Sequence, residues 1–160
     1  RELRGQKVIV FSQFQEHLRL VEDQLEKHSF GFAGLYASAI VQSAKRMKEI
    51  RMTALNRFEH EEGCQVLLMD GICSHGLDLK FCSFVILMEP IWDLSLEAQV
   101  VSRAHRMGQR NEVYVETLTM TNTIEEQVMS IRGLSREQST SHDAGTKESD
   151  QKGKDATDVL

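Results

Sequence analysis

The sequence lacks long apolar runs, an excess of basic residues and a signal peptide. No apolar run approaches the ~18 residues that a membrane-spanning helix needs, so we expect no membrane partner. The formal net charge is −5, which argues against a chain that binds nucleic acid through its overall field. Any contact with phosphate must therefore come from a local cluster of side chains.

Metal-ligand spacing is also missing. The three cysteines, Cys64, Cys73 and Cys82, form no CxxC or Cys/His pattern, so we expect no metal site. Scattered free thiols suit a reducing compartment, either the cytosol or the nucleus.

What is present is typical of one globular α/β domain. Apolar residues make up 41% and charged residues 27% of the 160 positions. The chain opens at Arg1 without a methionine, so we expect residues 1–6 to be a lead-in from a missing upstream region. Residues 7–132 would form the folded part. Residues 133–160 have no aromatic side chain and no apolar period, which predicts a disordered tail.

Strand and helix patterns alternate through the folded part. This alternation predicts a mostly parallel sheet with helices on both faces and ligands at the carboxyl ends of the strands. Strands are expected at residues 7–11, 32–36, 65–69, 84–88 and 113–120, and helices after residue 12, around 47–58, from 95 to about 106 and near 124–131. Capping boxes are expected to open two of the helices, formed by Ser12 with Gln15 and by Thr123 with Glu126.

The stretch QVVSRAHRMGQ places Gln99, Arg103 and Arg106 within about 60° of one another on the expected helix. Arginine suits planar, bidentate contact with phosphate oxygens. Taken alone, two arginines three residues apart more often form a solvated helix end that complements the dipole.

Five motifs, in order, resemble the Swi/Snf branch of the superfamily 2 helicase-like ATPases. The stretch above matches the last signature motif at Gln99, Arg103, His105, Arg106, Gly108 and Gln109. The other four are KVIVFSQF, LLMDGICSHGLDL, MEPIWDLSLEAQ and TNTIEEQVM. The resemblance is nearest to the branch whose members also carry F-box or RING-finger regions.

This resemblance implies the second of two RecA-like lobes, with ATP and Mg²⁺ held between them. No GxxxxGK[ST] phosphate loop occurs in the sequence, so the first lobe, absent from this chain, would hold the Mg²⁺. Arg103 and Arg106 occupy the positions of catalytic arginine fingers, and Gln99 would orient water or bond a phosphate. Such fingers stabilise charge on the transferring γ-phosphate.

The glycine-rich loop places Gly76 and Asp78 near the nucleotide and Gly71 near DNA, by the same resemblance. Without it, a tight turn explains the glycines equally well. Asp70 stands where the family has a hydroxyl side chain, and an aspartate facing a DNA phosphate would repel it.

Ser12 and Gln13 stand where the family's first second-lobe motif approaches nucleic acid, although a helix cap explains Ser12 as well. Trp92 is interpreted as a packing anchor, Glu89 as structural, and His105 as packing or hydrogen-bonding near the arginines.

The expected function is that of the C-terminal lobe of an ATP-dependent DNA translocase in chromatin or DNA repair, in the nucleus. Its partners would be the first lobe, double-stranded DNA and F-box- or RING-linked ubiquitin machinery. The isolated chain would not turn over ATP. The alternative is a non-catalytic, divergent lobe that serves as a scaffold or regulatory module.

Overall fold

The computed structural model describes residues 6–36, 44–71 and 76–133. The chain divides into two compact units, Arg1–Thr119 and Met120–Leu160. Most of the expected lead-in lies outside the described residues, as does the expected tail from residue 134 on. Gly133, where the tail was predicted to begin, is instead the last described position of a helical segment, residues 124–133.

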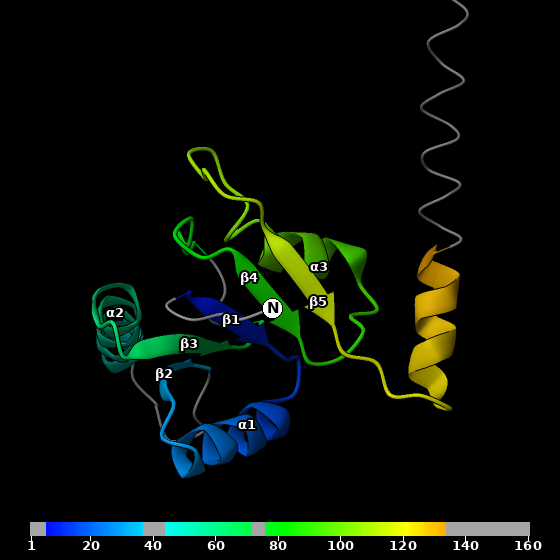
Figure 1. Cartoon of the computed structure of the whole chain (residues 1–160), viewed down its shortest axis with the longest axis horizontal. Helices are drawn as coiled ribbons and strands as arrows, with labels where there is room; N and C mark the ends of the chain where they lie inside the picture. The colour runs from blue at the N-terminus through cyan, green and yellow to red at the C-terminus, as the bar shows by residue number, and fades with distance from the viewer. Residues whose placement is uncertain (1–5, 37–43, 72–75, 134–160) are drawn as a thin grey trace, which may run out of the picture. The chain divides into compact units, whose positions relative to one another are not determined.

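The first unit is built on a five-stranded parallel sheet with the strand order β2-β3-β1-β4-β5 (Figure 1). This confirms the predicted fold class. The strands are β1 (Val8–Phe11), β2 (Gly31–Leu35), β3 (Cys64–Met69), β4 (Phe84–Leu87) and β5 (Tyr114–Thr117).

Helices cover both faces of the sheet, as expected for right-handed crossovers. Leu18 of α1 (Gln15–Lys27) packs with Val8 and Val10 on one face. The other face buries Ile9 and Phe11 against the remaining helices of this unit, α2 (Ala44–His60) and α3 (Leu94–Val101). Because β1 is central and covered on both sides, all four of its residues are apolar and buried.

The register of the sheet brings three carboxyl ends together. Phe11 at the end of β1 is level with Met69 of β3 on one side and with Leu87 of β4 on the other. The residues that follow these strands are therefore neighbours at one edge of the sheet, which is where ligands collect in open α/β folds.

The first predicted capping box is wrong. The N-cap of α1 is Phe14, which makes no side-chain cap bond, and the helix begins at Gln15. The Ser12 hydroxyl instead accepts a hydrogen bond from the Phe14 amide and donates one to Glu89. Ser12 therefore bonds Glu89, at the end of a neighbouring strand, and does not cap α1.

The second capping box is partly correct. Thr123 Oγ1 accepts from the amide of Glu125 at 3.2 Å, as a cap does. The carboxylate that bonds a backbone amide ahead of the helix, however, is that of Glu125 and not that of the predicted Glu126. It accepts from the Met120 amide at 2.7 Å.

Strand β5 is shorter than the predicted strand over residues 113–120. Among the described strands, β5 pairs with β4, whose last residue, Leu87, is level with Thr117. The ladder stops where β4 stops, although the alternating sequence continues.

Two cysteines are free and buried, Cys64 and Cys82, and Cys73 lies outside the described residues. Burial raises the pKa of the Cys82 thiol to about 12, so it stays protonated at neutral pH. Among the described residues there is no His/Cys/Asp/Glu group that could hold a metal ion, and no helix there is long and apolar enough to cross a membrane.

Ser29 follows α1 in the left-handed region, at φ 57°. An L-residue is strained there and glycine is not, so Ser29→Gly is expected to stabilise the fold by about 0.5–1 kcal/mol. Urea unfolding followed by circular dichroism measures the change. Ser29→Ala, which keeps the Cβ atom, is the control and should show no gain. Equal effects of the two changes would contradict this explanation.

Candidate nucleotide-facing site

The predicted phosphate-facing residues lie where α3 ends. The helix begins firmly, because Asp93 Oδ1 accepts from the Ser95 amide at 2.8 Å. It ends at Val101, five residues before the predicted end near Arg106.

Tighter turns replace the helix after Val101. The amide of Arg103 bonds the Val100 carbonyl and that of Ala104 bonds Val101, both at 3.1 Å and both three residues back. The prediction of one helical face carrying all three polar side chains is therefore wrong. Gln99 lies on α3, while Arg103 and Arg106 lie on the turns that follow it.

The arginine turn is held in place by the glycine-rich loop and by Gln109. The Leu79 amide donates to the Arg103 carbonyl at 3.0 Å. The Gln109 side chain donates to the carbonyls of Cys82, at 2.8 Å, and Ala104, at 3.4 Å. Gly108 allows the chain to turn back, at φ 96°. The structure thus joins the two motifs that the sequence analysis assigned to the nucleotide.

Two nitrogen atoms in this region are buried without a hydrogen-bond partner among the described residues, Gln99 Nε2 and Arg103 Nε. A buried donor left unpaired costs about 1–3 kcal/mol, so such groups are rare in folded proteins without a reason. Both belong to side chains predicted to face phosphate, and the third, Arg106, is exposed. The described part of the site therefore leaves two buried donors without an acceptor.

Asp78 supplies a negative charge that interacts with Arg106. Its carboxylate lies 3.3 Å from Lys80 Nζ and is about half exposed. Desolvation by itself raises the pKa of Asp78, but the hydrogen bonds and charge of Lys80, with the charge of Arg106, outweigh it and hold this pKa below its ordinary value. Asp78 is thus ionised at neutral pH and partly neutralises the two cations.

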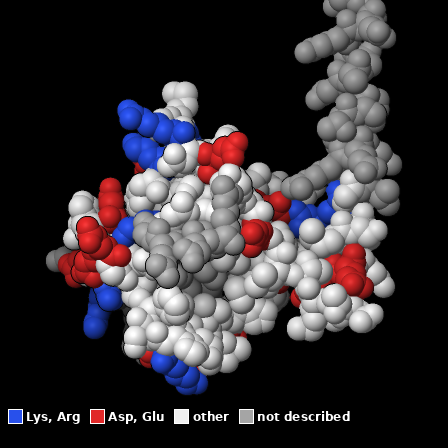
Figure 2. Space-filling model, viewed as in Figure 1, with Lys and Arg blue, Asp and Glu red and all other residues white. Residues whose placement is uncertain are grey.

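A hollow of about 360 Å³ lies beside Arg106. Lys and Arg atoms gather over the loop between α3 and β5, at the top of the view in Figure 2. The His105 side chain is exposed and lines this hollow together with Arg106. The lining residues are His105, Arg106, Gln109, Asn111, Glu112, Val113 and Tyr114.

The residues predicted to meet nucleic acid lie at the carboxyl edge of the sheet. Gln13 is exposed and Gly71 is partly buried, whereas Ser12 is fully buried with its hydroxyl on Glu89. Gly76 is exposed at φ 70°, in the loop that carries Asp78. The structure therefore separates the predicted site residues into one group around the arginines and another around the end of β1.

Two interpretations of single residues need correction. Asp70 is only 3% exposed, and Gln15 Nε2 donates to its carboxylate at 3.4 Å, so the expected repulsion of a DNA phosphate has no exposed charge behind it. Trp92 is 69% exposed, so it is no packing anchor among the described residues.

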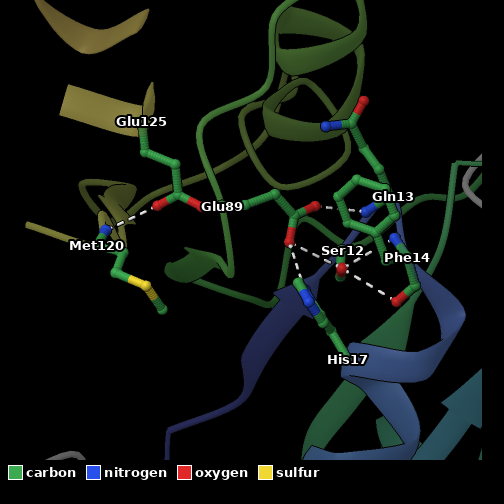
Figure 3. Close-up of polar contacts among 7 residues, drawn as sticks. All are labelled: Ser12, Gln13, Phe14, His17, Glu89, Met120 and Glu125. Atoms are coloured by element: carbon green, nitrogen blue, oxygen red, sulfur yellow. Dashed lines mark hydrogen bonds and ion pairs between the residues drawn. The ribbon is translucent and has the colours of Figure 1, made fainter. Parts of the chain in front are cut away.

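Glu89, interpreted from the sequence as structural, has more polar contacts than the sequence indicated. Its carboxylate accepts from Ser12 Oγ and from the Gln13 amide, and it also contacts His17 (Figure 3). Only the position of Glu89 directly after a strand hinted at a role at the sheet edge.

The strand order and the arginine turn at the end of α3 define a RecA-like α/β lobe. The chain belongs to the helicase conserved C-terminal domain family, whose model matches residues 1–108. This confirms the resemblance to the C-terminal lobe of the Swi/Snf-type helicases.

Curated relatives agree with this assignment. An F-box protein of Arabidopsis thaliana is 50% identical over 123 residues, covering 77% of this chain and 8% of that protein. DNA repair protein rad8 of Schizosaccharomyces pombe is 32% identical over 79% of this chain and 11% of that protein. The helicase-like transcription factor of Mus musculus is 31% identical over 82% and 13%, respectively. The chain thus spans a small part of each relative.

A solved structure shares the fold. The C-terminal part of the Fun30 ATPase domain superposes with a TM-score of 0.67 at 24% identity, over 78% of this chain and 38% of that one.

Proposed function

We propose that this chain is the C-terminal lobe of an ATP-dependent DNA translocase and that it supplies Arg103 and Arg106 to ATP bound mainly by a first lobe. The observation that carries the proposal is the pair of unpartnered buried donors, Gln99 Nε2 and Arg103 Nε, next to an exposed Arg106. Phosphate oxygens are acceptors that suit both a guanidinium N–H and an amide N–H.

The residues fit the phosphate end of a nucleotide but not its metal. Three side chains offer N–H donors, whereas the described residues contain no acidic cluster for Mg²⁺. The first lobe would hold that ion, which neutralises charge on the β- and γ-phosphates during transfer.

Each side chain has a separate task in this proposal. Arg103 is partly buried, and its backbone carbonyl accepts a hydrogen bond from the Leu79 amide, so it would approach the phosphate from a fixed turn. Arg106 is exposed and exchanges its weak attraction to Asp78 for a stronger one to phosphate as the lobes close. Gln99 orients water or a phosphate oxygen with its free amide, and Gly76 and Asp78 line the approach.

Duplex DNA would contact the carboxyl edge of the sheet at Gln13 and Gly71, with buried Ser12 shaping the loop. The names of two relatives, a DNA repair protein and a helicase-like transcription factor, support a DNA substrate and a nuclear location. The F-box relative supports ubiquitin machinery as a further partner. A scaffold role is the weaker candidate, because the buried Asp70 offers no exposed charge that would repel a DNA phosphate.

The test compares the full-length protein with this chain alone. We expect the full-length protein to hydrolyse ATP faster when duplex DNA is added, and the isolated chain to show no turnover. A DNA-stimulated rate from the isolated chain that Arg106→Ala abolishes would contradict the need for a first lobe. A full-length protein without any ATPase activity would favour the scaffold.

A further inference from the structure

Glu89 is a buried carboxylate that joins two strands of the sheet at their carboxyl ends. It is 4% exposed, its Oε1 accepts from the Gln13 amide at 2.6 Å, and its Oε2 accepts from Ser12 Oγ at 2.8 Å. His17 Nδ1 lies 3.3 Å from the same Oε2, on a side chain that is 44% exposed. Figure 3 shows all three partners converging on the one carboxylate.

The sheet register explains why these groups meet. Phe11 is level with Leu87, and the Met88 amide donates to the Phe11 carbonyl at 2.9 Å, so pairing continues one residue past β4. Gln13 lies two residues beyond Phe11, and Glu89 lies two residues beyond Leu87. Both therefore follow the same edge of the sheet by the same number of residues. A carboxylate there meets the first backbone amide that the ladder leaves unpaired.

The chain that follows Glu89 is held firmly as far as α3. Pro90 fixes its own backbone torsion, and Ile91 is fully buried in the core shared with α3. Asp93 then caps α3 through the Ser95 amide. Glu89 is therefore connected by a short segment with a buried anchor, Ile91, to the helix that carries Gln99 and leads into Arg103.

We propose that Glu89 is a positioning residue that couples the DNA-facing loop after β1 to the helix that leads into the arginines. The inference rests on the proposed function, because it assumes that the two groups meet DNA and ATP. Glu89 itself touches neither ligand, and its effect passes through the Ser12 and Gln13 contacts. Binding of DNA to the loop then biases the position of α3 through one buried carboxylate.

The experiment uses the full-length protein and four variants: Glu89→Ala, Glu89→Gln, Ser12→Ala and the double change Ser12→Ala/Glu89→Ala. ATPase rates are measured while duplex DNA is titrated. Charge-assisted hydrogen bonds are lost in Glu89→Ala, so the DNA concentration for half-maximal stimulation is expected to rise about tenfold or more. The KM for ATP should stay within about twofold, because no ATP contact is removed.

Glu89→Gln keeps the shape and an acceptor for the Gln13 amide, so its effect should be smaller than that of alanine. The double variant should be no worse than Glu89→Ala alone, since both changes remove the same contact. Glu116→Ala, an exposed carboxylate on β5, is the matched control and should behave as wild type.

Hydrogen exchange separates coupling from simple stability. Glu89→Ala should speed exchange in peptides covering residues 12–17 and also in those covering 94–103. Faster exchange confined to residues 12–17, or an equal loss of DNA-dependent and DNA-free ATPase rates, would overturn the proposal. A wild-type protein whose ATPase ignores DNA would instead refute the proposed function, while the exchange data would still decide whether Glu89 links the two segments.

Discussion

Replacing Arg106 with alanine is expected to lower the ATPase rate of the full-length protein by about a thousandfold or more. The Arg106 side chain is exposed, interacts electrostatically with the exposed Asp78, and borders the hollow at the end of α3. It is thus free to reach charge that develops on a transferring phosphate. Because that charge is greatest in the transition state, kcat should fall while the KM for ATP changes little.

Two further variants sharpen this test. Arg106→Lys keeps the charge but loses the planar fork, so it should recover only a small part of the rate. Arg110→Ala removes an exposed arginine from the same loop and should leave the rate within about threefold of wild type, as a surface change does. Equal rates for Arg106→Ala and Arg110→Ala would remove Arg106 from the catalytic machinery.

Among the glycines that the structure describes, Gly31→Ala is expected to cause the largest loss of stability, about 3 kcal/mol or more. A Cβ atom at Gly31 would lie 1.9 Å from the carbonyl oxygen of Gly63 and 3.2 Å from the Cα of Cys64. Both are backbone atoms of the approach to β3, where the pairing with β2 has a register shift, so neither can swing away. Urea unfolding followed by circular dichroism gives the change in the free energy of unfolding.

Gly63→Ala is the matched control for this clash. A Cβ atom at Gly63 meets nothing within 4 Å, so its free energy of unfolding should change by less than about 1 kcal/mol. If both variants unfolded at the same urea concentration as wild type, the result would contradict the close contact between Gly31 and the Gly63 carbonyl.

The buried strands of this fold could be predicted from the sequence because short runs of apolar residues are stable only when both of their faces are buried. VIVF at Val8–Phe11 is buried on both faces, and such a run specifies a central parallel strand. The ends of elements were less predictable, since they depend on partners far along the chain. Ser12 donates to Glu89, 77 residues away, and does not form the expected capping box. Strand β5 ends at Thr117, which is level with the last residue of β4.

The residues of the candidate site could be proposed from the sequence, but their geometry could not be predicted from it. The motif around Gln99, Arg103 and Arg106 carried the family resemblance, yet the helix was expected to continue through the arginines. It ends earlier because Leu79 and Gln109 bind carbonyls of the turn, and neither contact has a local sequence signal. Glu89 was interpreted as structural, but its partners Ser12 and Gln13 could not be named, since their meeting depends on sheet register.

The most direct test of the central claim is a structure of the full-length protein with duplex DNA and ADP bound to a fluoride mimic of the γ-phosphate. The account predicts that the Arg103 and Arg106 guanidinium groups and the Gln99 amide lie within hydrogen-bonding distance of the mimic, with the rest of the nucleotide held by the first lobe. Arginines that remain in solvent or contact only DNA, with the mimic coordinated entirely by the first lobe, would contradict it.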